Sequence, residues 1–145
     1  MLKIRRVHPD DIFPVINLAF ETLPERYNPT IFNQFFESFP EGFLIALDSH
    51  TFIGFLIGVK TAPSTARILM LAVEETHRRQ GIGSALLQQF LREITTHDVT
   101  RVDLEVRTSN HPALAFYQAR GFILQGILPH FYQNGEDAYS LRKEL

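Results

Sequence analysis

The chain has 145 residues, a net charge of −2, 45% hydrophobic residues and thirteen Phe, which are proportions typical of a globular protein. The weak negative charge argues against a dedicated nucleic-acid-binding protein, and the absence of cysteine excludes disulfides, cysteine-ligated zinc and a cysteine acyl-enzyme. The longest apolar run, residues 51–59, is too short to cross a bilayer. We expect a single domain over residues 1–145, cytoplasmic, with no membrane partner and no specific nucleic-acid partner.

Hydrophobic periodicity and turn residues predict an alternation of strands and helices along the chain. In chain order we expect a strand at 2–7, helices at 9–20 and 30–38, strands at 42–47, 52–60 and 67–73, a helix at 81–97, a strand at 101–106, a helix at 112–120, and strands at 122–128 and 138–145. This order predicts an α/β (α+β) domain with a mixed, mostly antiparallel sheet of about seven strands and about four flanking helices.

A basic, glycine-containing turn joins the strand at 67–73 to the helix at 81–97. It reads Arg78-Arg79-Gln80-Gly81-Ile82-Gly83-Ser84. Backbone N–H groups at the start of a helix have no partner within the helix, so they can bind phosphate oxygens. Position 86 is Leu where the Rossmann fingerprint needs a third glycine, and no lysine follows either glycine as in a Walker A loop. The turn therefore predicts an anion site for a phosphorylated cofactor of another kind.

The spacing Arg-x-x-Gly-x-Gly, here Arg78, Gly81 and Gly83, resembles the acetyl-CoA motif of the GNAT family of N-acetyltransferases. The order of expected elements also resembles the GNAT fold from end to end. The resemblance implies that acetyl-CoA is the acetyl donor, that the turn holds its pyrophosphate, and that the strands on either side of the long helix splay apart. The cofactor contacts that it implies are Leu71, Ala72, Val73, Arg78, Arg79, Gln80, Gly81, Ile82, Gly83 and Ser84. A free backbone N–H near 71–73 could stabilise the reaction's oxyanion.

A second motif runs from Leu104-Glu105-Val106-Arg107-Thr108-Ser109-Asn110 to Ala115-Phe116-Tyr117 and Gly121-Phe122. It resembles the motif of RimI-type protein N-terminal acetyltransferases. The resemblance implies that Glu105 is the general base, that Asn110 and Tyr117 contact the cofactor, and that Tyr117 is the general acid. A CoA thiol has a pKa near ~8.5 and a tyrosine near ~10, so charge stabilisation is the larger part of the Tyr117 role. The residues alone also allow Glu105 to pair with Arg107, and Asn110 to act only as a helix cap.

Two loop stretches point to a peptide substrate. Leu23-Pro24-Glu25-Arg26-Tyr27 resembles a loop of NatA-type catalytic subunits, and residues 132–139 resemble Tyr-Tyr-x-x-Gly-Glu-Asp-Ala-Tyr of protein N-terminal acetyltransferases. The resemblance implies that Glu25 and Tyr27 select the first residue of the substrate and that Tyr132 binds its backbone. Phe131 stands where the first Tyr of the pair would be, so one hydroxyl contact is lost.

We therefore expect an acetyltransferase of protein N-termini that transfers the acetyl group directly in a ternary complex. Small first residues such as Ser, Ala and Thr are expected, with Met starts as a further class, and the partners expected are protein N-termini and a ribosome or auxiliary subunit. A GNAT enzyme acting on a small amine or a lysine side chain is one alternative. A non-catalytic CoA-binding or ribosome-associated adaptor is another. No cluster of residues has metal-ligand spacing.

Overall fold

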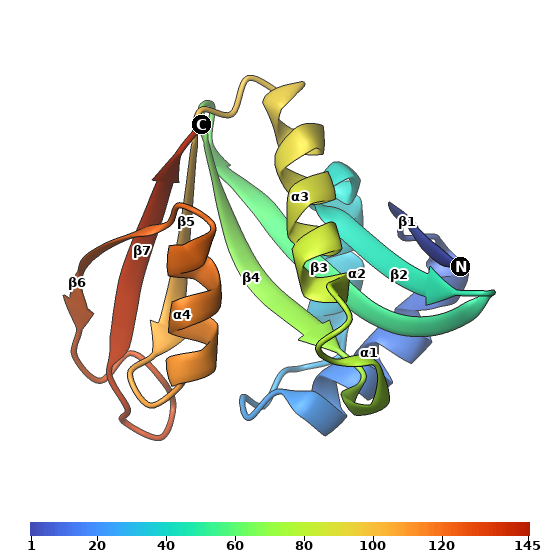
Figure 1. Cartoon of the computed structure of the whole chain (residues 1–145), viewed down its shortest axis with the longest axis horizontal. Coiled ribbons are helices and arrows are strands. Elements are labelled where there is room, and N and C mark those ends of the chain that lie inside the picture. Colours follow the sequence, from blue (N-terminus) through green and yellow to red (C-terminus); the bar gives the residue numbers. More distant parts are fainter.

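The computed structural model describes all residues 1–145 and contains seven strands and four α-helices (Figure 1). The strands are β1 (Leu2–Arg6), β2 (Phe43–Asp48), β3 (Thr51–Ala62), β4 (Thr65–Val73), β5 (Arg101–Arg107), β6 (Ile123–Leu128) and β7 (Ala138–Glu144). The helices are α1 (Ile12–Thr22), α2 (Thr30–Ser38), α3 (Ile82–Thr95) and α4 (His111–Ala119), with 3-10 turns at Pro9–Asp11, Pro40–Gly42 and Glu75–His77. None of these helices combines the length and apolarity needed to span a bilayer.

All seven strands form one sheet, in the order β1-β2-β3-β4-β5-β7-β6. Every neighbouring pair is antiparallel except β4 and β5, which confirms the mixed, mostly antiparallel sheet. Strand residues alternate between two cores, as the pleat requires. In β2, Leu44 and Ala46 join the core under α3 and α4, whereas Phe43 and Ile45 join the core under α1 and α2. The helices therefore cover both faces of the sheet.

The first predicted helix differs from the structure at both ends. A 3-10 turn occupies Pro9–Asp11, and α1 then runs from Ile12 to Thr22. The Asp11 carboxylate accepts a hydrogen bond from the His8 backbone N–H at 2.7 Å and pairs with Arg5 at 2.8 Å, so it stabilises a separate turn at the chain's exit from β1. The helix continues two residues past Phe20, until Pro24 removes the next backbone donor.

The parallel strands β4 and β5 separate soon after they meet. Only three residue pairs join them, from Thr65↔Arg101 to Arg67↔Asp103, although β4 continues to Val73 and β5 to Arg107. Figure 1 shows the two strands diverging between α3 and α4. This confirms the splay that the family resemblance implied, and it leaves the inner edges of both strands without a strand partner.

Candidate active site

The divergence of β4 and β5 leaves backbone groups of β4 free in the gap. The Glu74 N–H donates to the Ile53 carbonyl of β3 at 2.8 Å. Bonding direction alternates along an antiparallel pair, so Ala72 also bonds toward β3, whereas Leu71 and Val73 point their N–H and C=O groups into the gap. The Val73 carbonyl there accepts a hydrogen bond from Arg78 Nε at 3.1 Å. Two of the three β4 residues expected at the gap therefore face it, and Ala72 does not.

A cavity of about 490 Å³ lies between the start of α3 and α4. Its lining residues are Leu71, Val73, His77, Arg78, Arg79, Gly81, Ile82, Gly83, Ser84, Pro112, Ala113, Phe116, Tyr117 and Arg120. The helix ladder of α3 begins with the Ala85 N–H bonded to the Gly81 carbonyl, so the N–H groups of residues 82–84 have no partner in the helix. Gly81 has φ +78°, a conformation that residues with a Cβ rarely adopt.

The lining of this cavity fits a polyphosphate cofactor. It contains three arginines and no carboxylate, and it offers free backbone N–H groups at a helix start. Most of the predicted cofactor residues line it, whereas Ala72 and Gln80 lie outside it. Asn110 is placed at the neighbouring cavity, and its side chain also caps α4 by accepting a hydrogen bond from the Ala113 N–H at 3.2 Å.

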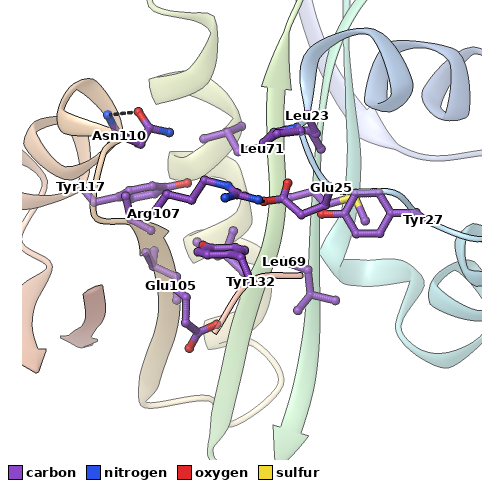
Figure 2. A pocket seen from close by; sticks show the side chains of 16 residues that line it. Leu23, Glu25, Tyr27, Leu69, Leu71, Glu105, Arg107, Asn110, Tyr117 and Tyr132 are labelled. Atoms are coloured by element: carbon purple, nitrogen blue, oxygen red, sulfur yellow. Dashed lines mark hydrogen bonds and ion pairs between the residues drawn. The ribbon is translucent and has the colours of Figure 1, made fainter. Parts of the chain in front are cut away.

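A smaller cavity of about 160 Å³ adjoins the first and shares Leu71, Ala113 and Tyr117 with it. The structure brings all the predicted catalytic and substrate residues to its wall, together with the predicted cofactor residue Asn110. These residues are Glu25, Tyr27, Glu105, Asn110, Tyr117 and Tyr132. They come from the α1–α2 loop, from β5, from the β5–α4 turn, from α4 and from the β6–β7 loop, and Figure 2 shows them converging from both sides of the gap.

Tyr117 lies at the junction of the two cavities. Its ring is buried between Phe116 and Phe122, with ring centroids 5.1 Å and 5.4 Å away, and its hydroxyl points into the site (Figure 2). Burial raises the pKa of Tyr117 well above its usual value. The phenol is therefore neutral at physiological pH, and its O–H is available as a hydrogen-bond donor to the contents of either cavity.

Glu105 pairs with Arg67 of β4 rather than with Arg107. The alternative in which Glu105 pairs with its neighbour on β5 is therefore wrong. The Arg67 guanidinium reaches Glu105 Oε2 from the last residue of β4 that still pairs with β5, so the carboxylate is drawn toward the base of the gap. In Figure 2 this carboxylate points away from the Tyr117 hydroxyl. One or more water molecules could bridge the distance to a substrate amine.

Arg107 connects the two loops at the mouth of the site. Its guanidinium binds Glu25 at 2.9 Å and Glu136 at 2.9 Å, donates to Asn134 Oδ1 at 3.1 Å, and lies 4.1 Å above the Tyr132 ring. Its side chain is only 13% exposed. The sequence analysis did not select Arg107. The sequence signal for Arg107 was the pair of acidic residues Glu25 and Glu136 in the two loops, because two carboxylates that lie close together need a shared cation.

Electrostatics at the mouth of the site are dominated by these contacts. Hydrogen bonds from Ser109 and Arg107 lower the pKa of Glu136 to about 2. Burial, with Glu25 nearby, raises the pKa of Tyr27 to about 12. Burial also raises the pKa of Tyr132. The mouth therefore presents an ionised Glu136 beside Glu25 on one arginine, and two neutral phenols as donors.

A third cavity of about 360 Å³ continues outward from the mouth. It is lined by Glu25, Arg26, Tyr27, Phe35, Ile68, Leu69, Met70, Glu105, Phe131, Tyr132 and Gln133. Phe131, which replaces the first tyrosine of the expected pair, stands at this outer cavity and packs edge-on against Tyr132 with ring centroids 5.0 Å apart. This surface is apolar along β4 and has room for residues that follow a bound amine.

Comparison with known proteins gives concordant results. The model of the acetyltransferase (GNAT) family matches residues 11–122. An N-alpha-acetyltransferase of Saccharolobus solfataricus is 30% identical over 154 residues, covering 98% of this chain and 92% of the relative. The catalytic subunit NAA10 of the Arabidopsis thaliana N-terminal acetyltransferase A complex is 29% identical, covering 100% of this chain and 79% of the relative. The crystal structure of Ard1 from Thermoplasma volcanium superimposes with a TM-score of 0.95 at 35% identity, covering 99% and 97% of the two chains.

Proposed function

The chain belongs to the acetyltransferase (GNAT) family, and we propose that it acetylates the α-amine of protein N-termini with acetyl-CoA as donor. Members of this family are acetyl-CoA-dependent acyltransferases. The observation that carries the proposal is the meeting of two cavities at Tyr117. One is cationic and fits a CoA; the other is walled by carboxylates and phenols and opens between two loops. Relatives named N-alpha-acetyltransferase over the full chain support the same assignment.

The cofactor residues follow from the larger cavity. Residues 82–84 at the start of α3 and the side chains of Arg78 and Arg79 would hold the pyrophosphate, and the gap between β4 and β5 would take the pantetheine arm. When bound there, acetyl-CoA supplies an acetyl group activated as a thioester. The free N–H groups of Leu71 and Val73 would stabilise negative charge that develops on the acyl oxygen.

The proton of the substrate amine would be taken up by residues on the other side of the gap. A peptide α-amine has a pKa near ~7.8 and a lysine amine near ~10.4, so at neutral pH roughly a few hundredfold more of the α-amine is neutral. A carboxylate acting through water is then a sufficient base, and Glu105, held by Arg67, is proposed in that role. The raised pKa of Tyr117 makes its phenol a weak acid, so it stabilises the leaving sulfur chiefly by donating a hydrogen bond.

The mouth of the site defines the proposed substrate. Glu25 and Tyr27 would select the first residue of the peptide, and Tyr132 would bind the peptide backbone. The preferred first residues would be small ones such as Ser, Ala or Thr, with peptides that start with Met as a further class. The proposal places the enzyme in the cytoplasm, where new N-termini emerge from the ribosome. Association with the ribosome or with an auxiliary subunit belongs to the same proposal, and a relative named as the catalytic subunit of a complex supports it.

Mass spectrometry after incubation with acetyl-CoA tests the assignment. The panel contains peptides whose first residues are Ser, Ala, Thr, Met-Leu or Glu, and one N-terminally blocked peptide with an internal lysine. We expect one acetyl group on free N-termini only, strongly reduced in Glu105→Gln and Tyr117→Phe and unchanged in Arg92→Gln, an exposed control on α3.

Other outcomes would change the assignment. Modification of the blocked peptide would move it to lysine acetylation. Binding of acetyl-CoA, seen as thermal stabilisation, without any peptide product would favour a small-amine substrate or a non-catalytic CoA-binding protein.

A further inference from the structure

Two half-buried cations, Arg120 and Lys143, lie beside the cofactor cavity without a carboxylate partner. Arg120 follows α4; its guanidinium donates to Ser84 Oγ at 3.3 Å and to the Phe116 carbonyl at 3.0 Å, and it lies 3.9 Å above the Phe116 ring. Lys143 of β7 donates from Nζ to the Arg120 carbonyl at 3.0 Å. All these protein acceptors are uncharged, so two positive charges are held close together without neutralisation.

These cations face a hollow of their own. A cavity of about 220 Å³ is lined by Ser84, Leu87, Gln88, Leu91, Arg120 and Lys143. It shares Ser84 and Arg120 with the 490 Å³ cavity, and neither lining contains an aspartate or a glutamate. The positive charge at the glycine turn therefore continues along α3 to Arg120 and Lys143.

The backbone is shaped to admit the lysine ammonium. Gly121 has φ +90°, and a Cβ at this position would lie 2.5 Å from Lys143 Nζ. Any other residue would therefore be strained and would also displace the ammonium group. One role for this arrangement is structural, since a lysine that binds the last carbonyls of a helix stabilises its end. The contacts of Lys143 with the Arg120 carbonyl and of Arg120 with the Phe116 carbonyl both fit that role, but neither contact neutralises the charge of the two cations.

We propose that Arg120 and Lys143 form the subsite for the 3′-phosphate of coenzyme A, an assignment that rests on the proposed function. Coenzyme A carries a pyrophosphate and a separate phosphate monoester on its ribose. The glycine turn with Arg78 and Arg79 accounts for the pyrophosphate. A phosphate monoester carries a charge of about −1.5 to −2 at neutral pH, which two cations neutralise. Arg120 can also bind phosphate oxygens through two of its N–H groups at once.

Calorimetric measurement of the dissociation constants of CoA and 3′-dephospho-CoA tests the subsite without requiring turnover. The wild-type chain should bind CoA more tightly than dephospho-CoA by on the order of tenfold, the usual size of a charge-assisted contact. Arg120→Gln and Lys143→Gln should each weaken CoA binding several-fold more than dephospho-CoA binding, so that the preference shrinks. Arg92→Gln, which removes an exposed cation from α3 outside both cavities, should keep the full preference.

Each alternative result overturns the proposal in a distinguishable way. Equal affinity of the wild type for both ligands would exclude a 3′-phosphate subsite while leaving the cofactor cavity intact. Equal weakening of both ligands by the two substitutions would show a purely structural role for these residues, and the melting temperatures of the variants would show the same. Binding of neither ligand to the wild type would overturn the proposed function and the subsite with it.

Discussion

Arg67 and Glu105 form an ion pair at the place where β4 and β5 stop pairing. The contact joins the two strands at the base of the gap and fixes the carboxylate proposed as the base. Because Arg67 is 35% exposed and Glu105 only 11%, the carboxylate is the better-shielded member of the pair. The ion pair thus links the geometry of the open sheet to the position of a reacting group.

Arg67→Gln should therefore lower kcat, by on the order of tenfold, with a smaller change in KM. The carboxylate would lose its fixed position while the cavities that bind both substrates stay intact. Arg142→Gln is a matched control, because it removes a 2.9 Å ion pair to Asp103, which lies on β5 like Glu105. Arg101 still lies 3.5 Å from the Asp103 carboxylate in this variant. Steady-state kinetics on a Ser-starting peptide separates the two parameters. Equal effects of both substitutions would contradict a positioning role for Arg67.

Removal of the Arg107 cation should affect both substrate loops. Arg107→Met leaves Glu25 and Glu136 facing each other without their shared partner, so we expect a several-fold increase in the peptide KM and a melting temperature several degrees lower. The Kd for CoA should stay unchanged, because Arg107 does not line the cofactor cavity. Arg107→Lys should restore charge but not the simultaneous contacts to Glu25, Glu136 and Asn134. A parallel loss of CoA affinity would show general unfolding instead.

The contacts of both arginines join residues far apart in the sequence, and this separates what the sequence could predict from what it could not. Local signals sufficed for elements: α2 was expected at 30–38 and lies at Thr30–Ser38, and the turn after β2 has φ of +48° at Ser49 and +77° at His50, as a tight hairpin requires. The cofactor turn was also local, because its residues are consecutive. The Arg107 contacts span 82 residues to Glu25 and 29 to Glu136, and no periodicity records such separations.

The splay of β4 and β5 illustrates a second limit. The sequence predicts β4 as an apolar strand and β5 as a strand of clean alternation, and only the family resemblance implies that they diverge. The structure shows why: pairing stops after Arg67, and from Ile68 onward the inner edge of β4 borders the two cavities. Because bonding direction alternates along β4, the backbone groups of Leu71 and Val73 face the gap and those of Ala72 face β3. The motif implied all three residues as cofactor contacts because it does not record this alternation.

Stability should depend on Glu136 in acid. The pKa of Glu136 is lowered from 4.5 to about 2, so its stabilising contribution is present above pH 4.5 and is lost as the pH falls toward 2. Glu136→Gln should therefore melt below the wild type at pH 7, and the two melting curves should converge as the pH approaches 2. Calorimetry across pH 2 to 7 measures this directly. A constant difference over the whole range would contradict a contribution from the ionised carboxylate.

Tyr117→Phe should reduce kcat by on the order of tenfold to a hundredfold, because the leaving sulfur loses a donor from the buried ring. The folded-state pKa of Tyr117 lies above its usual value near ~10, so the phenol stays neutral throughout the working range of the enzyme. The ratio of wild-type to variant kcat should therefore be constant from pH 7 to 9, measured with the same peptide and saturating acetyl-CoA. CoA affinity should change little, since the ring still fills the same site between Phe116 and Phe122. A ratio that falls steeply with rising pH would instead show that Tyr117 loses its proton within this range, and would return the residue to the role of a general acid.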